Sequence, residues 1–403
     1  MNVTEKLYYL DGDASLCSAI VLDCIKDGDF YFIVTDKTVI FPDGGGQPSD
    51  FGLLDGQMVK LAYEKDGVVF HRVNKPISIE KHVKISADMK RRLDHSQQHT
   101  GEHMLSGLAK QMFNVNNVGF HMGEDYSTID IDKELTVEQL MELELEANQN
   151  VYRDIPIKYD IVNENDIKKF KLRKKASGLK GDIRIVGIEG VDSCTCCGTH
   201  CKTTGAVGTI KITAHQKYKG GTRLWFLCGG RAIFDYQNKQ AILETLTKQF
   251  SVKSEDLLNA VSTRGNALLL AQRDLKIKTT ALLAYKAKEV FANALTVNNI
   301  QIVIYHEEGM NQSDMRPFAE KLLACSENVI VLLFSTINGA LYYQLAETGG
   351  VTPNINELIA AVNAAFNARG GGRDGFAQGM GKTGVGVDAS IEQITRYLMS
   401  VAK

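Results

Sequence analysis

The chain has 403 residues, of which 44% are hydrophobic and 23% charged, and its formal net charge is −2. This composition is typical of a soluble globular protein, and the length predicts two or three domains. No apolar run approaches membrane-spanning length, and the first residues lack the apolar core of a signal peptide. We therefore expect a cytoplasmic protein with no membrane partner.

Residues 1–85 are predicted to form a small β-barrel. Two segments, 30–34 and 68–70, are rich in β-forming side chains, and Asp-Gly pairs mark the turns. The segment 43–48 is predicted to be an unusual loop, because its three successive glycines permit backbone conformations that other residues avoid. These glycines are Gly44, Gly45 and Gly46.

Residues 86–235 are predicted to form an α+β domain. The apolar spacing predicts a helix over residues 87–113 that begins at Ser86 or Asp88. A second helix is predicted to start at a capping box of Thr136 and Gln139. Strands are expected at residues 127–131, 157–162, 183–188, 209–213 and 222–228.

Two pairs of side chains in this domain are potential metal ligands. His99 and His103 lie four residues apart on the first helix, so they project from one face. Cys196 and His200 have the same spacing, and three imidazoles with one thiolate suit tetrahedral zinc. The alternatives are a buried histidine pair beside an unrelated cysteine-rich turn, or a thiolate-rich structural site that leaves the histidines unused. That second site would use Cys194, Cys197 and Cys201.

A cluster of positive charge lies between the two ligand pairs. Six of the eight residues from 168 to 175 are basic, namely Lys168, Lys169, Lys171, Arg173, Lys174 and Lys175. Such a cluster favours a polyanion through counterion release. A solvated surface explains the run equally well.

The last 168 residues are predicted to form a helical arm and a further domain. Residues 236–296 contain almost no Gly or Pro, so we expect two long helices with a break at 251–254 and with Ser254 capping the second. Residues 297–403 alternate between strand and helix patterns, and Asn354 with Glu357 marks one helix start. The segment 370–379 is expected to be a loop. Its consecutive glycines could expose backbone N–H groups to phosphate, beside the charged side chain of Arg373.

Four blocks of the sequence, in this order, resemble the AlaX family of alanyl-tRNA editing proteins in its long form. Residues 38–52 resemble the glycine-rich barrel motif, and residues 98–103 and 196–200 resemble the two metal motifs. Residues 370–379 resemble a loop of the DHH-associated C-terminal domain. Cys197 stands where the family more often has glycine, so a neighbouring residue could replace one of the four predicted metal ligands. No aminoacylation domain precedes the barrel, so we expect an editor that acts in trans.

The resemblance implies a four-part α+β protein. Its parts are a small β-barrel (1–85), a zinc-containing editing domain (86–235), a helical hairpin or coiled-coil arm (236–296) and a C-terminal α/β tRNA-binding domain (297–403). The implied activity is hydrolysis of seryl-tRNA(Ala), with glycyl-tRNA(Ala) as a second substrate. A homodimer through the arm or the C-terminal domain is a further expectation.

The resemblance also implies roles for individual residues. Zn²⁺ would be bound by His99, His103, Cys196 and His200, either to activate water or to position the substrate. Thr100 or Gln98 would reach the serine hydroxyl, and His121 would orient water or contact the ribose. The tRNA would be contacted by Gly44, Gly45, Gly46, the basic residues of 168–175, Gly371, Gly372 and Arg373.

Two other functions fit parts of the pattern. A zinc-stabilised RNA-binding protein without catalysis would use the same ligands and the same basic cluster. A DHH-type phosphoesterase is disfavoured, because Asp94-His95 is followed by Ser96 rather than by a second histidine.

Overall fold

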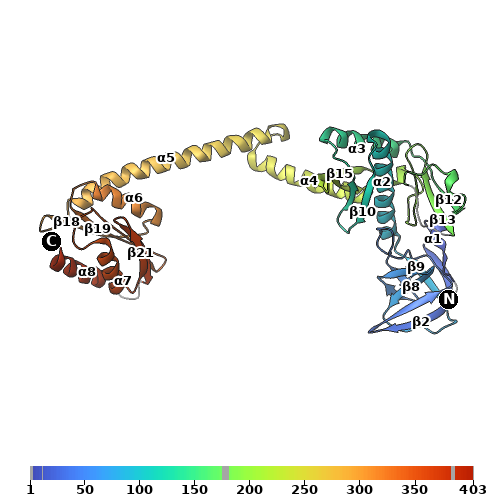
Figure 1. The fold of residues 1–403 in the computed structure, drawn as a ribbon, viewed down its shortest axis with the longest axis horizontal. Helices are drawn as coiled ribbons and strands as arrows, with labels where there is room; N and C mark the ends of the chain where they lie inside the picture. The colour runs from blue at the N-terminus through green and yellow to red at the C-terminus, as the bar shows by residue number, and fades with distance from the viewer. Residues whose placement is uncertain (1–2, 11, 175–180, 383–385, 403) are drawn as a thin grey trace. The chain divides into compact units, whose positions relative to one another are not determined.

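The computed structural model describes residues 3–10, 12–174, 181–382 and 386–402, so the predicted tRNA contact Lys175 lies outside the described residues. The chain divides into two compact units, Met1–Leu246 and Thr247–Lys403, which are described separately (Figure 1). The first unit contains both the expected barrel and the expected editing domain. Of the helices in the described segments, none combines the length and apolar character needed to cross a membrane.

The N-terminal part of the first unit is a nearly closed, seven-stranded antiparallel sheet. One edge strand, β6, contacts β8 near the opposite edge, so the sheet curls on itself around Val21, Ile33 and Ile85. The strands follow the order β6 (Gln57–Val59), β5 (Gly52–Leu54), β9 (His82–Ala87), β2 (Leu16–Asp27), β3 (Phe30–Thr35), β8 (Val68–Val73) and β7 (Ala62–Lys65). Two short strands, β1 (Glu5–Lys6) and β4 (Lys37–Thr38), pair beside α1 (Leu7–Leu10).

The rest of the first unit is an α+β fold built around the helix α2 (Met89–Phe113), which leads away from the barrel (Figure 1). One sheet has the order β10 (Asn117–Met122), β11 (Ser127–Ile131), β16 (Gly221–Cys228) and β15 (Ile210–Tyr218). The other has the order β12 (Ile157–Asn163), β13 (Asp182–Ile188) and β14 (Asp192–Thr195). The remaining elements are α3 (Val137–Tyr152), η1 (Ile167–Lys169), η2 (Gly205–Val207) and most of α4 (Gly229–Phe250), whose last four residues belong to the second unit.

Local sequence signals fix the starts of α2 and α3, as expected. Asp88 caps α2 by accepting hydrogen bonds from the backbone of Lys90 and Arg91. Thr136 and Gln139 form a complete capping box at the start of α3. Both predicted helix starts are therefore confirmed.

Two glycines allow α2 to lie deep in the fold. A Cβ atom on Gly101 would stand 2.2 Å from the Cys228 sulfur, and one on Gly107 would stand 2.3 Å from the carbonyl oxygen of Val191. Glycine at these positions therefore permits close contact with β16 and with the chain before β14. The helix is buried over most of its length, polar residues included.

A buried ion pair fastens α2 to the barrel. Arg92 donates through Nε to the Asp50 carboxylate at 2.8 Å, and through its other nitrogens to Asp50, Val39 and Gly12. The same carboxylate accepts a hydrogen bond from the backbone of Phe41 at 2.8 Å. The pair thereby holds both ends of the segment that contains the three glycines.

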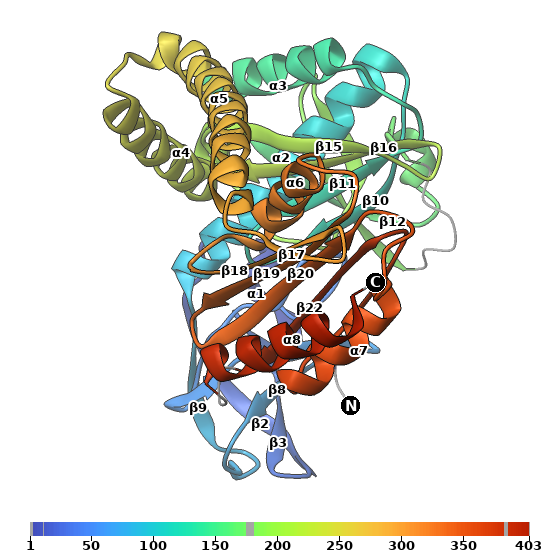
Figure 2. The same cartoon turned by 90° about the vertical axis from the view of Figure 1, so that its left-hand side faces the viewer.

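The second unit is a three-layer domain with a mixed sheet. The strands follow the order β17 (Leu295–Val297), β18 (Ile300–Glu308), β19 (Val329–Ile337), β20 (Ala340–Glu347), β22 (Phe376–Lys382) and β21 (Arg369–Arg373). Only β18 and β19 pair in parallel among these strands of the described chain. Helices α7 (Ile355–Ala365) and α8 (Val387–Val401) cover one face, and α6 (Gln312–Leu323) with the end of α5 (Leu257–Phe291) covers the other (Figure 2).

Two expectations for this part of the chain need correction. Ser254 does not cap the long helix α5, because it begins the short turn η3 (Ser254–Asp256) and Asp256 stands at the helix start. The segment 370–379 is not an irregular loop but most of the hairpin β21–β22. Two of its glycines have a packing role, since a Cβ atom on Gly370 or Gly379 would stand 2.1 Å or 2.4 Å from the Tyr343 side chain.

The buried ion pair leads to a stability prediction. Arg92→Ala leaves the Asp50 carboxylate buried without its partner, so we expect the free energy of unfolding to fall by about 3–5 kcal/mol. Urea unfolding followed by tryptophan fluorescence reports this directly, because the single tryptophan, Trp225, lies in β16 of the same unit. Arg153→Ala, which removes an exposed arginine 3.7 Å from Glu146, should cost less than about 1 kcal/mol. Equal losses for both variants would contradict this account.

Candidate metal centre and cleft

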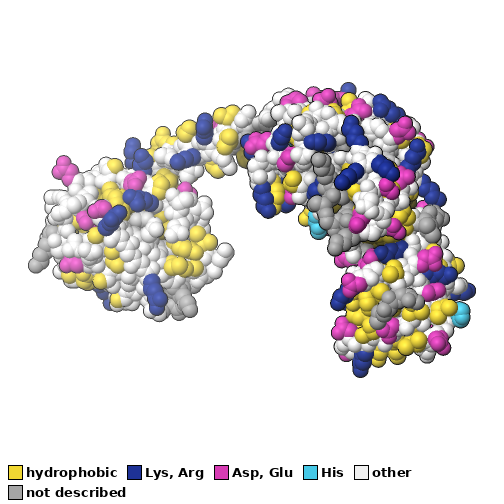
Figure 3. Space-filling view, turned by 45° about the vertical axis from the view of Figure 1, so that its right-hand side comes forward, with side chains coloured by type: hydrophobic (Ala, Val, Ile, Leu, Met, Phe, Trp, Pro, Cys, Tyr) yellow, Lys and Arg dark blue, Asp and Glu magenta, His cyan; other side chains and the backbone are white. Residues whose placement is uncertain are grey.

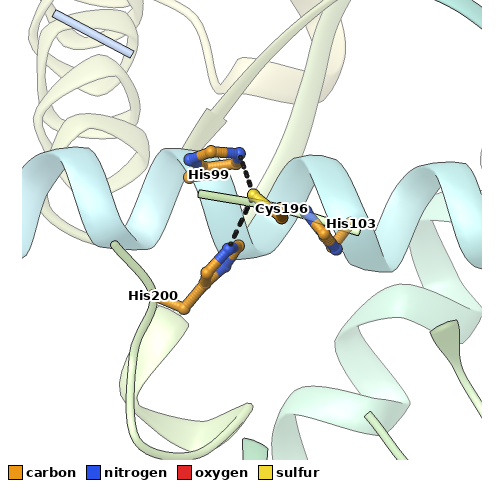
Figure 4. Close-up of side chains that lie close together, drawn as sticks. All are labelled: His99, His103, Cys196 and His200. Carbon is orange, nitrogen blue, oxygen red and sulfur yellow. Dashed lines mark hydrogen bonds between the residues drawn. The ribbon is translucent and has the colours of Figure 1, made fainter. Parts of the chain in front are cut away.

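Four side chains from two distant segments meet at one point. The ligand atoms of His99, His103, Cys196 and His200 lie within 4.8 Å of one another. The Cys196 sulfur is 3.3 Å from Nε2 of His99 and 3.3 Å from Nε2 of His200. Figure 4 shows the two helical imidazoles and the two side chains of the loop pointing toward a common centre.

Each of the three imidazoles contacts a polar side chain through Nδ1, the ring nitrogen on the far side from the cluster. The partner of His99 is Oε1 of Gln47 at 2.9 Å, and the partner of His103 is Oδ2 of Asp192 at 2.9 Å. The partner of His200 is the hydroxyl of Thr100 at 3.4 Å. Such partners fix the tautomer and ring orientation of a metal-binding histidine, and here they leave all three Nε2 atoms free to face the sulfur.

Gln47 connects the glycine-rich segment of the barrel to the centre. Besides His99, its Oε1 accepts the backbone N–H of Thr199 at 3.0 Å, and its Nε2 donates to the Thr199 hydroxyl at 2.8 Å. Gly45 and Gly46 precede it with φ of +62° and +85°, which glycine adopts without strain. The glycines therefore shape the turn that places the Gln47 carboxamide beside His99.

The electrostatics of the cluster suit a cation. Burial raises the pKa of the Cys196 thiol, but interactions with the imidazoles of His99 and His200 outweigh burial and bring that pKa well below its usual value. Burial lowers the pKa of His200 to about 3, which keeps this imidazole neutral. A thiolate and a neutral imidazole are the protonation states that bind a metal ion.

Asp192 and Arg173 complete the surroundings of His103. Burial alone would lower the pKa of His103, but its hydrogen bonds to Asp192 and Cys196 raise that pKa well above the usual value. The Asp192 carboxylate also accepts from Nε of Arg173 at 2.8 Å.

Sequence reasoning missed Gln47 and Asp192. Gln47 lay inside a motif already singled out for its glycines, whereas nothing in the sequence linked Asp192 to the histidines.

The thiolate-rich alternative gains no support from the geometry. Within the described residues, the cluster includes no cysteine besides Cys196. Burial raises the pKa of Cys201 to about 12 and also raises that of Cys194, so both favour the neutral thiol. Cys197, where the family more often has glycine, is exposed at the surface.

The cluster lies at the wall of an open cleft of about 520 Å³. His99, His103 and Cys196 line it, together with the aromatic ring of Phe120, whose centroid is 5.4 Å from that of His99. A second cleft of about 880 Å³ shares Arg173 with the first and is lined by three lysines. These are Lys110, Lys158 and Lys171.

The three residues expected to touch the substrate lie away from this cleft. Gln98 is fully buried. Its carboxamide accepts a hydrogen bond from the backbone N–H of Cys228 at 2.9 Å and donates one to the carbonyl oxygen of the same residue at 3.1 Å. Thr100 is also fully buried and accepts the backbone N–H of Cys201 at 3.0 Å. His121 is exposed on β10 and does not line the cleft, whereas its neighbour Phe120 does. In this structure Gln98 is therefore a partner of β16 and Thr100 a partner of His200, and their contact with a substrate stays a prediction.

The basic stretch has mixed surroundings. Lys168, Lys171 and Lys174 are exposed, and Lys174 lines the cleft beside the cluster. Lys169 pairs with Asp166 at 2.6 Å, and the Arg173 side chain is mostly buried against Asp192. Contact of these residues with tRNA stays a prediction. On the face seen in Figure 3, Lys and Arg side chains of the first unit are interspersed with Asp and Glu.

Comparison with known proteins identifies the class. A family model described as "Threonyl and Alanyl tRNA synthetase second additional domain" matches residues 183–224, and one described as "DHHA1 domain" matches residues 298–400. The alanine–tRNA ligase of Pyrococcus abyssi is 31% identical over 98% of this chain, which spans 44% of that ligase. The chain thus consists of regions that also occur in aminoacyl-tRNA synthetases.

The particular family follows from relatives of similar length. The alanyl-tRNA editing protein AlaX-L of Pyrococcus horikoshii is 31% identical over 94% of both chains. The alanyl-tRNA editing protein Aarsd1 of Rattus norvegicus is 28% identical over 86% of this chain and 84% of its own. The chain belongs to the AlaX-type alanyl-tRNA editing proteins in their long form.

The close contact of Gly198 with His99 leads to a prediction for metal binding. A Cβ atom at position 198 would stand 2.1 Å from Cε1 of His99, so Gly198→Ala must displace that imidazole. We expect at least a tenfold loss of Zn²⁺ affinity in competition with a chelator. Gly187→Ala is the matched control, because nothing lies within 4 Å of the added carbon. Retained affinity in Gly198→Ala would show that His99 is not a ligand.

The position of Thr100 leads to a second prediction. Thr100→Val keeps the shape of the side chain but removes the oxygen that faces His200 and accepts from Cys201. We expect Zn²⁺ affinity to fall about 10- to 100-fold, while Thr280→Val on α5, which also removes a helical threonine hydroxyl, leaves it unchanged. Unchanged affinity with a lost preference for serine would instead place the Thr100 hydroxyl against the substrate.

Proposed function

We propose that this protein is a trans-acting hydrolase that removes serine, and also glycine, from mischarged tRNA(Ala). The relatives named as alanyl-tRNA editing proteins support a hydrolase acting on aminoacyl-tRNA. The observation that carries the proposal is the convergence of four potential ligands at the wall of an open cleft.

The donor set fits Zn²⁺, which His99, His103, Cys196 and His200 would hold. Three nitrogens and one sulfur are borderline-soft ligands, and their partners on the far side are those that histidine ligands need. Bound Zn²⁺ would supply positive charge at the wall of the cleft and hold the four side chains in place. The rest of the catalytic work falls to the side chains around the cleft.

The cleft offers surfaces for the end of a tRNA. Phe120 presents an aromatic ring on which the terminal base can stack, as single-stranded nucleotides commonly do on proteins. Lys174 in the first cleft and Lys171 in the second can neutralise phosphates of the acceptor stem. Gly44 and Gly45 line an adjoining pocket, where their backbone can approach the 3′ end.

The second unit would contact another part of the tRNA. Gly371, Gly372 and Arg373 lie exposed on the edge strand β21, and the Arg373 guanidinium points into solvent. Exposed apolar side chains along α5, including Leu258, Leu275 and Tyr285, are consistent with a homodimer through this arm.

Discrimination against alanine needs a polar contact. Serine differs from alanine by one hydroxyl, and an apolar pocket separates such a pair only weakly. Polar groups on the cleft wall that hydrogen-bond the serine hydroxyl favour serine over alanine. Glycine, which is smaller than alanine, needs no such contact to enter.

A deacylation assay tests the proposal. Seryl-, glycyl- and alanyl-tRNA(Ala) are incubated with the protein, and release of the amino acid is followed with and without a chelator. We expect release of serine and glycine, little release of alanine, and loss of activity when Zn²⁺ is removed.

The same assay separates the rival function. A zinc-stabilised RNA-binding protein would bind tRNA and lose zinc to the chelator, yet release no amino acid. Tight tRNA binding without any release of serine by the zinc-loaded protein would therefore overturn the proposed hydrolase.

A further inference from the structure

One carboxylate stands directly beside the metal centre without being part of it. Glu102 precedes His103 on α2, lines the cleft and is 5% exposed. Its Oε2 atom is 3.7 Å from Nε2 of His103, the nitrogen that faces the cluster. The carboxylate therefore faces the place where a substrate ester would meet the four ligands.

The two oxygens of this carboxylate have different surroundings. Oε1 accepts hydrogen bonds from the Ser106 hydroxyl at 2.6 Å and from the Asn117 carboxamide at 2.6 Å. The Arg173 guanidinium lies 3.7 Å from the same oxygen. No group of the described residues hydrogen-bonds Oε2. One oxygen is thus anchored, and the other is left open toward the cleft.

The spacing of the residues has a chemical meaning of its own. His99, Glu102 and His103 form a His-x-x-Glu-His pattern, in which two imidazoles of one helix hold a metal ion and the carboxylate between them lies next to it. In zinc peptidases with this or the reversed spacing, that carboxylate serves as the general base for an attacking water.

A protein base is needed here because the four side chains already complete a tetrahedron. Catalytic zinc sites usually keep one position open for water, and four protein ligands leave none. The described cleft wall carries one other carboxylate, Asp182, which is exposed at the start of β13. Glu102 is the one that is buried, anchored and next to the cluster.

Building on the proposed function, we infer that Glu102 is the catalytic general base of the hydrolysis. Oε2 accepts a hydrogen bond from a water molecule in the cleft and takes its proton as the water oxygen bonds to the ester carbonyl carbon. The bond between that carbon and the ribose oxygen then breaks, and Glu102 returns the proton to the ribose oxygen. The products are free serine and a tRNA with an intact 3′ end, so no other reactant is required.

The test is the isosteric variant Glu102→Gln in the full-length protein. Its carboxamide oxygen still accepts from Ser106 and Asn117, but the group that replaces Oε2 cannot take a proton. We expect kcat for seryl-tRNA(Ala) to fall about 10²- to 10⁴-fold. Zinc content, melting temperature and affinity for a non-hydrolysable seryl-amide analogue of the terminal adenosine should remain those of the wild type. Glu142→Gln, on the exposed surface of α3, is the matched control and should retain full activity.

A second variant tests the role of the proton acceptor itself. Glu102→Ala leaves a space beside the cluster, and added formate should restore part of the rate by supplying a carboxylate there. Chloride at the same ionic strength should restore none.

The outcomes are distinguishable. Wild-type kcat in Glu102→Gln overturns this inference and leaves the proposed function intact. Loss of zinc from Glu102→Gln also overturns it, because Glu102 would then be a ligand. A tenfold or greater loss of analogue affinity with unchanged kcat makes it a binding residue instead. Absence of deacylation by the wild-type protein would overturn the proposed function, and this inference with it.

Discussion

The site depends on one constraint: each of three imidazoles must present the same ring nitrogen to a common point. A histidine side chain has two nitrogens and free torsions, so spacing along a helix is not enough to aim it. Here the orientation of each ring is set by a polar partner at Nδ1, the nitrogen on the far side of the ring from the cluster. These partners are Gln47, Asp192 and Thr100. These partners come from the barrel, from β14 and from α2 itself. The cluster therefore takes this arrangement only when three segments distant in the sequence come together.

This constraint makes the barrel part of the site rather than an appendage. Gln47 hydrogen-bonds both His99 and Thr199, so one carboxamide orients a ligand on the helix and the chain beside a ligand on the loop. The segment that carries Gln47 is itself fixed, since the Asp50 carboxylate accepts from the backbone of Phe41 and from Arg92 of α2. A buried carboxylate is costly unless it is paired, and that cost ties the position of the glycine-rich segment to the position of the helix. The barrel and the helix therefore hold each other in the register that the cluster requires.

The sequence predicted what depends on local periodicity and missed what depends on tertiary contact. The caps of α2 and α3 follow from short-range hydrogen bonds, and the shared face of His99 and His103 follows from the helical repeat. The same repeat places Gln98 and Thr100 on different faces of the helix, about 200° apart, but does not say what lies against each face. The backbone of β16 is the partner of Gln98, and the backbone of Cys201 is the partner of Thr100. The glycines at 370–379 suggested a loop, whereas Gly370 and Gly379 lie in strands, where the Tyr343 side chain leaves no room for a Cβ atom. Whether a glycine serves flexibility or close packing depends on neighbours distant in the sequence.

The six residues from 98 to 103 show how a helix buried on all sides can still carry chemistry. Successive side chains are about 100° apart, so a buried run of this length meets a different partner in every direction. Burying a polar atom costs free energy unless it is hydrogen-bonded, and most of these atoms are satisfied by the fold. Gln98 is satisfied by β16, Thr100 by the backbone of Cys201, and Oε1 of Glu102 by Ser106 and Asn117. The Nε2 atoms of His99 and His200 face the Cys196 sulfur at 3.3 Å, and no group of the described residues hydrogen-bonds the second oxygen of Glu102. These atoms lie where the four side chains could hold a cation, beside a carboxylate oxygen at the cleft wall.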